Sequence, residues 1–419
     1  MARKMKDSGI EWIGEIPEDW EVSKISNVYK LRRTKVDDVQ YPPLSVTKQG
    51  VVPQLEHVAK TNDTANRKLV KKGDFVINSR SDRRGSCGIS NYEGSVSLIN
   101  TVLEPTKNMH PNYYDWLFNT SLFADEFYKW GNGIVDDLWT TTWDEMKKIT
   151  IPMPPFKEQE KISDYIDRNV NIIDKVNNNL TQEIQTLEDY KKSLITEAVT
   201  KGLDKNVEMK DSGIEWIGEI PKHWEIIKLK NVADTITKGI SPNYVEEKLT
   251  PVVNQATFSK GYFDYDLKYC NDSIKSEGLL YKNDILLATT GGGVLGKTYY
   301  FQEDEEYLAS ADVAFIRISN PEQSKLVYYF LSTKYDLLNG IFAKGATNQT
   351  HLQIDMLANM YIALPNEREL KGIIDYLDKI DETIEKSMGL KQKQLSILEN
   401  YKKSLIYEYV TGKKEVSDA

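Results

Sequence analysis

The stretch Met5–Pro17, MKDSGIEWIGEIP, occurs a second time at Met209–Pro221 with every letter unchanged. The two copies lie 204 residues apart (209 − 5), close to half of the 419-residue chain. Both halves also end alike, since Leu187–Ile195 (LEDYKKSLI) returns as Leu398–Ile406 (LENYKKSLI). A repeat of this length is a domain in itself and not a unit of a stacked array. The sequence therefore predicts a tandem duplication with fixed ends and a variable middle.

The net charge of the chain hides an uneven distribution. A net charge of −9 at first argues against a nucleic-acid partner. Between Lys24 and Arg84, however, 14 Lys and Arg stand against 6 Asp and Glu, a local balance of +8 (14 − 6). Such a basic segment is either a surface that faces phosphates or an ordinary solvated face, and the charge alone leaves both interpretations open.

The composition also bears on membranes and metals. No window approaches 18 consecutive apolar residues and the first residues lead into no apolar signal region, so we expect a cytoplasmic protein with no membrane segment. The two cysteines, Cys87 and Cys270, form no CxxC pair, and the four scattered histidines show no metal-ligand spacing. The sequence predicts neither a disulfide framework nor a metal site.

The repeat blocks and the variable regions predict an α+β fold. Each block mixes Gly, Pro and Trp, which is typical of a structured turn and not of a helix. Short β-rich runs follow, such as 75–78 and 96–99, with a helical piece over about 113–130. The tryptophans expected to anchor the two cores are Trp12, Trp20, Trp216 and Trp224.

Each half ends in a long helix. From Lys157 to about Lys201 there is no Gly or Pro, and apolar residues recur every seven positions. The first helix carries Ile173, Leu180, Leu187 and Leu194 with the companion line Ile184 and Ala198, and the second carries Ile384, Leu398 and Leu405 with Leu395 and Tyr409. One such helix alone is unstable in water, but two can bury their stripes on one another. We expect them to pack antiparallel, with the second helix ending near the first repeat block.

Three motifs suggest enzymes, and each has a plainer interpretation. Gly291–Thr298 (GGGVLGKT) fits the phosphate-binding pattern GxxxxGK[ST], but a strand-like Tyr-Tyr-Phe follows where that motif opens a helix. Met153–Phe156 (MPPF) resembles a methyltransferase motif with Met in place of the amine-binding residue, and no glycine-rich cofactor motif accompanies it. Asp137, Glu145 and Lys147 resemble a nuclease triad without the adjacent strands it needs. We interpret these stretches as a glycine-rich β-loop and surface charge.

Polar, partly basic loops occur at matching places in the two halves. Residues 73–86 align with 283–297, 45–50 with 253–257, and 131–133 with 344–349. Glycine lets backbone approach a ligand, Arg can pair with guanine, and Asn or Gln with adenine. The candidate DNA-binding residues are Lys48, Gln49, Arg67, Asn78, Ser79, Arg80, Arg83, Arg84, Ser86, Asn254, Gln255, Lys260, Thr289, Thr290, Lys297, Lys344, Thr347, Asn348 and Gln349.

Over essentially its full length the chain resembles the specificity (S) subunits of type I restriction–modification enzymes. The resemblance rests on the duplicated GIEWIGEIPxxW block, on Ile151–Gln159 (IPMPPFKEQ) with its partner Ile362–Glu369 (IALPNERE), and on the two LExYKKSLI helix ends. The second copy departs from the Pro-x-x-Glu-Gln pattern, because Leu370 follows Glu369.

The resemblance implies a non-catalytic DNA-binding subunit of a host-defence complex. Each target-recognition domain would read one half of a bipartite, asymmetric site, and the helices would set the spacer. Two modification subunits would methylate adenine with S-adenosylmethionine, and two restriction subunits would use ATP and Mg²⁺; this chain itself would hold no cofactor. The helix residues expected to carry the partner subunits are Ile173, Leu180, Leu187, Leu194, Leu398 and Leu405.

The resemblance also implies boundaries along the chain. The expected segments are a repeat block (1–20), target-recognition domain 1 (21–155), the central helix (156–202), the second block (203–224), target-recognition domain 2 (225–365), the C-terminal helix (366–412) and a tail (413–419). Lys24 to Lys72 would contact phosphates, while Lys48, Arg80, Arg83 and Arg84 would read bases. Two alternatives remain at this point: a coiled-coil scaffold for two protein partners, and an ATPase or nuclease.

Overall fold

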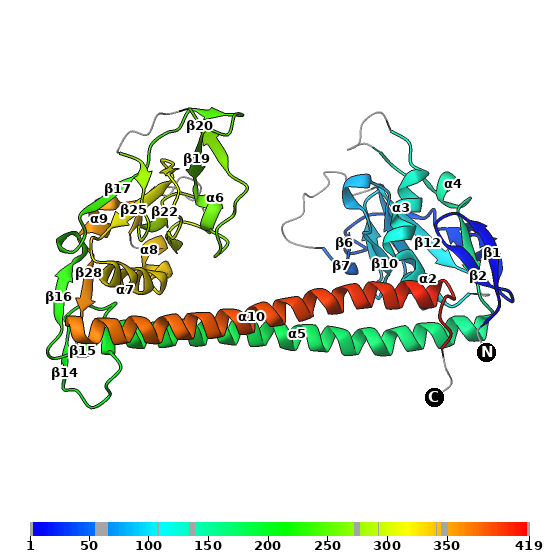
Figure 1. Ribbon diagram of the computed structural model, residues 1–419. Helices are drawn as coiled ribbons and strands as arrows, with labels where there is room; N and C mark the ends of the chain where they lie inside the picture. Colours follow the sequence, from blue (N-terminus) through cyan, green and yellow to red (C-terminus); the bar gives the residue numbers. More distant parts are fainter. Residues whose placement is uncertain are drawn as a thin grey trace. The chain divides into compact units, whose positions relative to one another are not determined.

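The computed structural model describes residues 3–54, 66–106, 109–133, 139–271, 277–291, 293–340, 342–344 and 351–416. The chain forms two compact units, Met1–Thr181 with Gln392–Ala419 (unit 1) and Gln182–Lys391 (unit 2). Two long helices, α5 (Phe156–Lys201) and α10 (Glu367–Val410), each contribute a segment to both units (Figure 1). Their bounds lie inside the two ranges predicted for long helices.

Each copy of the repeat block is a β-hairpin. Strand β1 (Met5–Ile10) pairs antiparallel with β2 (Gly14–Pro17), and β14 (Met209–Asp211) pairs in the same way with β15 (Glu219–Pro221). The glycines that flank each turn are left-handed, with φ of +69° and +74° in the first copy and +70° and +74° in the second. An L side chain would be strained there, which explains the two glycines of each block. The predicted structured turn is confirmed.

A buried tryptophan fastens each block to the first turn of a long helix. Trp20 is fully buried, and its Nε1–H donates to Glu158 Oε2 (3.0 Å) at the start of α5. Trp224 is 1% exposed, and its Nε1–H donates to Glu369 Oε2 (2.6 Å) at the start of α10. The predicted anchoring role of both residues is confirmed. The half-buried Trp12 and Trp216, which were also predicted as anchors, pack against the same two cores.

The end of the other long helix reaches each block as well. A Cβ added to Gly412, after α10, would lie 2.4 Å from Pro17 Cδ, and one added to Gly202, after α5, would lie 3.1 Å from Trp224 Cζ2. Lys413 Nζ also donates to the Ile13 carbonyl (2.9 Å). Each block therefore lies at the start of one long helix and the end of the other, as the duplicated sequence predicts.

Segments of α5 and α10 lie side by side within each unit and run antiparallel (Figure 1). The cross-helix contacts are Tyr165–Tyr409 (ring centroids 4.5 Å apart) and Asp174–Lys402 (2.6 Å) in unit 1, and Glu183–Lys391 and Lys191–Glu385 (2.6 Å) in unit 2. Residue numbers rise along α5 as they fall along α10, which gives the antiparallel order. Lys391 interrupts the heptad line of the second helix, and its ion pair with Glu183 accounts for that interruption.

Both variable regions contain a four-stranded antiparallel sheet with the same neighbours. The order is β10-β9-β12-β4 in unit 1 and β23-β22-β25-β17 in unit 2. The bounds are β4 (Tyr29–Leu31), β9 (Phe75–Asn78), β10 (Cys87–Ile89), β12 (Asn100–Pro105), β17 (Thr235–Lys238), β22 (Ile285–Ala288), β23 (Thr298–Tyr300) and β25 (Val313–Arg317). The two halves thus share a fold although their variable sequences differ.

A second group of strands packs beside each of these sheets. In unit 1 it has the orders β11-β8-β5 and β6-β7, and in unit 2 the order β18-β20-β19-β24-β21. The bounds are β5 (Lys35–Val36), β6 (Leu44–Thr47), β7 (Gly50–Pro53), β8 (Arg67–Val70), β11 (Gly94–Val96), β18 (Tyr244–Val245), β19 (Thr250–Val253), β20 (Lys268–Cys270), β21 (Leu279–Leu280) and β24 (Tyr307–Ala309). The predicted run 96–99 is wrong as a strand, because β11 ends at Val96 and residues 98–99 form a turn.

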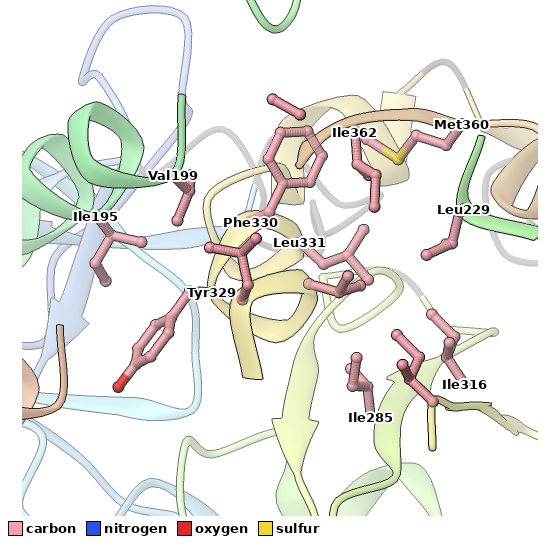
Figure 2. Packing of buried hydrophobic residues seen from close by; sticks show 14 of the residues in the cluster. Ile195, Val199, Leu229, Ile285, Ile316, Tyr329, Phe330, Leu331, Met360 and Ile362 are labelled. Atoms are coloured by element: carbon pink, nitrogen blue, oxygen red, sulfur yellow. The ribbon is translucent and has the colours of Figure 1, made fainter. Parts of the chain in front are cut away.

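Short helices cover the sheets and complete the two cores. Their bounds are α1 (Ile25–Val28), α2 (Pro111–Phe118), α3 (Ser121–Lys129), α4 (Trp143–Met146), α6 (Gln255–Phe258), α7 (Pro321–Ser332), α8 (Tyr335–Gly340) and α9 (Ile354–Ala358). The helical piece predicted over 113–130 is two helices, because Thr120 Oγ1 accepts the Phe123 N–H and starts α3 afresh. In unit 2, residues of α7 such as Tyr329, Phe330 and Leu331 pack with Ile195 of α5 (Figure 2).

Each variable region begins and ends on paired strands. Strand β3 (Glu21–Lys24) pairs with β13 (Thr150–Met153), and β16 (Glu225–Lys228) pairs with β28 (Tyr361–Leu364). The two ends of each variable region therefore lie next to each other within its unit. No helix among the described residues is long and apolar enough to cross a membrane.

Asp115 of α2 gives unit 1 a dependence on pH. Its Oδ1 accepts hydrogen bonds from the Ile89 N–H (3.2 Å) and from Asn119 Nδ2 (3.3 Å), yet burial raises the pKa of Asp115 to about 6. The folded carboxyl holds its proton more tightly than the unfolded one. Stability therefore falls as the pH rises from about 4 to about 6, and does not recover above that range.

We expect Asp115→Asn to raise the free energy of unfolding at neutral pH by about 1–3 kcal/mol, because an amide carries no charge to bury and its oxygen can still accept the Ile89 N–H. Thermal melts at pH values below and above 6 measure the effect. The gain should be largest at neutral pH and small near the lower end of the range, and a gain independent of pH would contradict the account.

Candidate nucleic-acid interface

A buried carboxylate introduces the first candidate loop in each unit. Asp74 (2% exposed) precedes β9 and Asp284 (1% exposed) precedes β22. Asp74 Oδ2 accepts the Lys71 N–H (2.8 Å) and Asp284 Oδ2 accepts the Tyr281 N–H (2.8 Å), so both close the same turn. The residue before each is left-handed, Gly73 with φ of +91° in unit 1 and Asn283 with φ of +73° in unit 2. The alignment of residues 73–86 with 283–297 is confirmed.

An arginine neutralises each of these carboxylates. In unit 1 Arg32 Nε donates to Asp74 Oδ2 (2.6 Å), and in unit 2 Arg317 Nη2 donates to Asp284 Oδ2 (2.6 Å). Burial outweighs these bonds at Asp284 and raises its pKa. Arg32 directly follows β4, whereas Arg317 ends β25, so both units contain the ion pair although the arginine comes from a different place in the sheet. Each pair fixes the strand that delivers the candidate loop.

In unit 1 the first two candidate loops meet around one concavity of about 440 Å³. It is lined by the predicted residues Lys48, Gln49, Arg67, Asn78, Arg83 and Ser86, together with Leu44, Ser45, Val46, Thr47, Gln54, Asp82, Ser97 and Asn100. The tight turn of the β6–β7 hairpin supplies Lys48 and Gln49, and the segment between β9 and β10 supplies Arg83 and Ser86. The structure therefore brings together residues that the sequence places in separate loops.

Asn100 is a lining residue that the sequence analysis missed. It stands opposite Asn78 in the β9–β12 register. Its Nδ2 donates to Ser97 Oγ (3.0 Å), while its Oδ1 is buried and has no hydrogen-bond partner among the residues that the structure describes. A buried acceptor without a partner is costly unless a ligand satisfies it. No local pattern marks this residue, and only the strand register places it beside Asn78.

Three other predicted residues of unit 1, Ser79, Arg67 and Arg84, contact other side chains of the same unit. Ser79 is buried and its Oγ lies 3.1 Å from Thr101 Oγ1, so its hydroxyl is engaged inside unit 1. Arg67 lines the concavity but is buried, and its Nε donates to Ser95 Oγ (2.8 Å). Arg84 forms an ion pair with Asp125 and lies 5.8 Å from the Tyr128 ring centroid.

In unit 2 the loop after β19 and the loop after β22 are joined by a hydrogen bond between two predicted residues. Gln255 Oε1 accepts a hydrogen bond from Thr290 Oγ1 (3.2 Å), which joins the loop after β19 to the loop after β22. Lys260 is exposed, with its Nζ 3.0 Å from Asp264 Oδ2. Gln255, Lys260 and Thr290 therefore remain candidates for contact with a ligand.

Three predicted residues of unit 2 hold the local structure instead. Asn254 caps α6, its Oδ1 accepting the N–H groups of residues 256 (2.9 Å) and 257 (3.3 Å). Thr289 is fully buried, so it presents no surface to DNA. Lys297 Nζ donates to the Ser259 carbonyl (2.7 Å), and β23 follows it directly. The interpretation of 291–298 as a glycine-rich β-loop is confirmed for the described residues of that stretch, because a strand and not a helix follows Lys297.

The third pair of loops is also equivalent in the two units. In unit 1, Arg80 and Asn132 each form a β-bridge with Thr140. In unit 2, Thr290 forms a β-bridge with His351, and His351 pairs with Lys344 where β26 (Ala343–Lys344) lies beside β27 (His351–Leu352). Thr347, Asn348 and Gln349 lie outside the described residues. Among the described residues, Asn132 and Lys344 are thus each joined to the loop that follows β9 or β22 through one intervening residue, Thr140 in unit 1 and His351 in unit 2.

Part of the basic segment 24–84 faces inward. Besides Arg32 and Arg67, Lys68 Nζ donates to the Asn100 carbonyl (2.6 Å), and burial lowers the pKa of both Arg67 and Lys68. Among the described residues, the exposed cations of the segment are Lys24, Lys30, Arg33, Lys35, Lys48, Lys71, Lys72, Arg83 and Arg84. The local excess of positive charge is therefore partly structural and partly on the surface.

The described residues of the suggested enzyme motifs are not arranged as those motifs require. Glu145 lies in α4 and Lys147 just after it, with Lys147 Nζ 2.5 Å from Asp144 Oδ1, and Asp137 lies outside the described residues. Met153 ends β13 and Phe156 begins α5, so that motif joins a strand to a helix. Within the described ranges no group of three or more His, Cys, Asp and Glu side chains could hold a metal ion.

The residues predicted to bind partner subunits are largely used inside the chain. Ile173, Leu180 and Leu405 are buried, and Leu187, Leu194 and Leu398 are half-buried, so burial inside the chain already uses much of their apolar surface. Other large apolar side chains are exposed on the helices of unit 1, namely Ile172 (60%), Val176 (40%), Ile397 (56%) and Tyr401 (52%). Each of these directly precedes a position of the heptad lines, which is the signal that could have identified them.

Comparison with known proteins follows the same division into halves. The family model of the type I restriction modification DNA specificity domain matches residues 17–186 and 221–395. The chain is 26% identical to the putative type I restriction enzyme MjaX specificity subunit of Methanocaldococcus jannaschii, with 96% of each chain covered. It is 27% identical to the type I restriction enzyme MjaVIII specificity subunit of the same organism, with 96% of this chain and 95% of that one covered.

A solved structure shares the fold. It is described as the structural basis underlying complex assembly and conformational transition of the type I R-M system, and it superposes with a TM-score of 0.70 at 14% identity, covering 95% of this chain and 99% of that chain. The family model covers most of both halves, on the duplicated scaffold described above. The chain therefore belongs to the family of type I restriction–modification specificity subunits, and it carries two DNA specificity domains in tandem.

Proposed function

We propose that each unit of this specificity subunit reads one half of a bipartite DNA site. The observation that carries the proposal is the concavity of unit 1, where Lys48, Gln49, Asn78 and Arg83 come together from separate loops. The duplicated fold supports a second, different reading surface in unit 2 around Gln255, Lys260 and Thr290. Since the two variable sequences differ, the two half-sites should differ as well.

The side chains of the concavity suit base edges in the major groove. Lys48 and Arg83 can donate to guanine O6 and N7, and Gln49 and Asn78 can pair with adenine N6 and N7. The buried Oδ1 of Asn100 can accept from an exocyclic amino group, which would satisfy it. The exposed cations around the concavity would contact phosphates and hold the duplex in register.

Selection from randomised duplexes tests this role. The assembled complex should enrich a split motif, and Lys48→Ala with Arg83→Ala should relax the first half of that motif by about 1–3 kcal/mol for each true base contact while the second half stays fixed. Lys30→Ala is a matched control, because an exposed cation on β4 outside the lining should weaken all sequences equally. An unaltered motif in the double variant would contradict base reading by these residues.

The helix pair is the proposed docking surface for the modification subunits. Ile172, Val176, Ile397 and Tyr401 lie at one level of unit 1, because Asp174 pairs with Lys402, and they occupy the same two heptad positions on both helices. Exposed apolar groups on an otherwise polar helix pair are typical of an interface.

We expect Ile397→Ser with Tyr401→Ser to lower the affinity for the modification subunit by at least about tenfold, since two apolar anchors are lost. Native mass spectrometry of the mixed subunits measures the loss. Asn400→Ser, an exposed polar neighbour on the same turn, is the control and should assemble normally. Full assembly of the double variant would exclude this surface.

The chemistry of the complex would reside in partner subunits. Members of this family are non-catalytic, and we propose that two modification subunits supply S-adenosylmethionine-dependent adenine methylation and two restriction subunits supply ATP- and Mg²⁺-dependent cleavage. This chain would then contribute only recognition and assembly, and no cofactor would bind to it.

A further inference from the structure

The link between repeat block and long helix holds an internal cation in unit 1. Arg3 Nη1 donates to Glu158 Oε1 (2.5 Å), and Arg3 Nη2 donates to Glu158 Oε2 (3.1 Å) and to Asp19 Oδ1 (2.9 Å). The guanidinium also lies 5.6 Å from the ring centroid of Trp20, whose indole donates to the same glutamate. Arg3 thus forms a fork on a carboxylate beside an indole ring.

The equivalent place in unit 2 is a pocket. Val207 stands where unit 1 has Arg3, two residues before the shared methionine, and Gly372 stands where unit 1 has Lys161. A pocket of about 250 Å³ is lined there by Val207, Gly372 and Glu369, the counterpart of Glu158. A Cβ added to Gly372 would meet no atom within 4 Å. Two smaller residues have left open the space that a long cationic side chain fills in unit 1.

The pocket suits a cation. Glu369 and Asp204 line it, and Lys201 and His223 are the basic residues of the lining. His223 stands where unit 1 has Asp19. His223 and Asn366 both hydrogen-bond Glu369 Oε1 (2.6 Å and 3.0 Å), so Oε2 is the atom left for a further donor. Burial raises the pKa of Glu369, but hydrogen bonds from Trp224 and His223 (both 2.6 Å) outweigh it and hold that pKa below its ordinary value. The carboxylate is therefore ionised at neutral pH, beside the same kind of buried indole that accompanies Arg3.

We propose that this pocket of unit 2 binds the guanidinium of an arginine side chain supplied by a partner polypeptide. A guanidinium suits the site better than an ammonium, because its several N–H groups can reach Glu369 Oε2 and Asp204 together while its planar face can lie against an indole. Unit 2 has only two arginines of its own in the sequence. Arg317 is bound to Asp284, and Arg368 is not among the residues that line the pocket.

The indole N–H of Trp224 reports on the pocket because it donates to Glu369. The full chain, labelled with ¹⁵N-tryptophan, is titrated with N-acetyl-arginine methylamide, and the Trp224 signal is assigned from its loss in Trp224→Phe. The Trp224 signal should shift and saturate at millimolar concentrations, and N-acetyl-lysine methylamide should bind at least about tenfold more weakly. Trp20 should not respond, since Arg3 already occupies its site.

Two exchanges between the repeats sharpen the test. Val207→Arg should fill the pocket and abolish the Trp224 response, while Arg3→Val should open the equivalent site and make Trp20 respond; the remaining indole signals report whether each variant is folded. No response of Trp224, an equal response to the lysine probe, or a response that persists in Val207→Arg would overturn the proposal. None of these readouts involves DNA, so the outcome is independent of the proposed recognition role.

Discussion

Exchanging residues 25–149 for the corresponding segment of another specificity subunit will replace one half of the methylated motif and leave the other half unchanged. The physical reason is the way each variable region is joined to its unit. The Ile25 N–H donates to the Ile149 carbonyl (3.1 Å) directly beside the β3–β13 pair, so the exchanged segment starts and ends at adjacent strands. The repeat block, the long helices and unit 2 are not altered by the exchange.

The matched experiment exchanges residues 229–360, which are bounded in the same way by the Leu229 N–H and the Met360 carbonyl (2.8 Å). It should replace the other half of the motif. Sequencing of methylated adenines in cells that carry each chimera with its modification subunit gives both results. If either exchange altered both halves, or neither half, the assignment of one half-site to each unit would be wrong.

Arg317→Met will destabilise unit 2 by about 3–5 kcal/mol, because it leaves the carboxylate of Asp284 buried and uncompensated. The methionine keeps much of the apolar contact with the Tyr281 ring, which lies 4.1 Å from the guanidinium carbon in the native protein. The loss therefore reports mainly on charge. Thermal and urea unfolding of the full chain measure it.

Lowering the pH and adding a second substitution both test whether Arg317→Met loses stability through the buried charge or through lost packing. The pKa of Asp284 already lies above its ordinary value, because burial outweighs the hydrogen bonds from Arg317 and Tyr281, and removing the arginine raises it further. Stability of Arg317→Met should thus be regained as the pH falls and the carboxyl binds a proton. Arg317→Met with Asp284→Asn should recover most of the loss at neutral pH, and a deficit that persists in both tests would contradict the account.

The local signals in the sequence predicted much of the scaffold. The duplicated block, the Gly- and Pro-free helices and their heptad lines depend on neighbouring residues, and the structure confirms all three. Trp20 and Trp224 were identified as anchors, although their glutamate partners were not, because Glu158 lies 138 residues from Trp20. The break at Thr120 was missed because an N-cap inside an apolar run starts a new helix without interrupting the spacing of the apolar residues.

The recognition surface was predicted only in part, since residue type does not tell which way a side chain points. Asn78 lines the concavity, whereas Ser79, the next residue, turns inward to Thr101. Asn100 lies 22 residues after Asn78, on β12, and only the β9–β12 register shows that the two residues are neighbours. On the helices the heptad residues face the second helix of the same chain, so a partner is left with the residues that flank them, such as Ile397.

Sequencing of methylated adenines in cells that express this chain with its modification subunit, and in matched cells that lack the chain, tests the central claim most directly. We expect a split, asymmetric motif that is methylated only when the chain is present and whose methylation returns when the chain is restored. Methylation of the same motif without the chain, or a single undivided motif in its presence, would contradict the account.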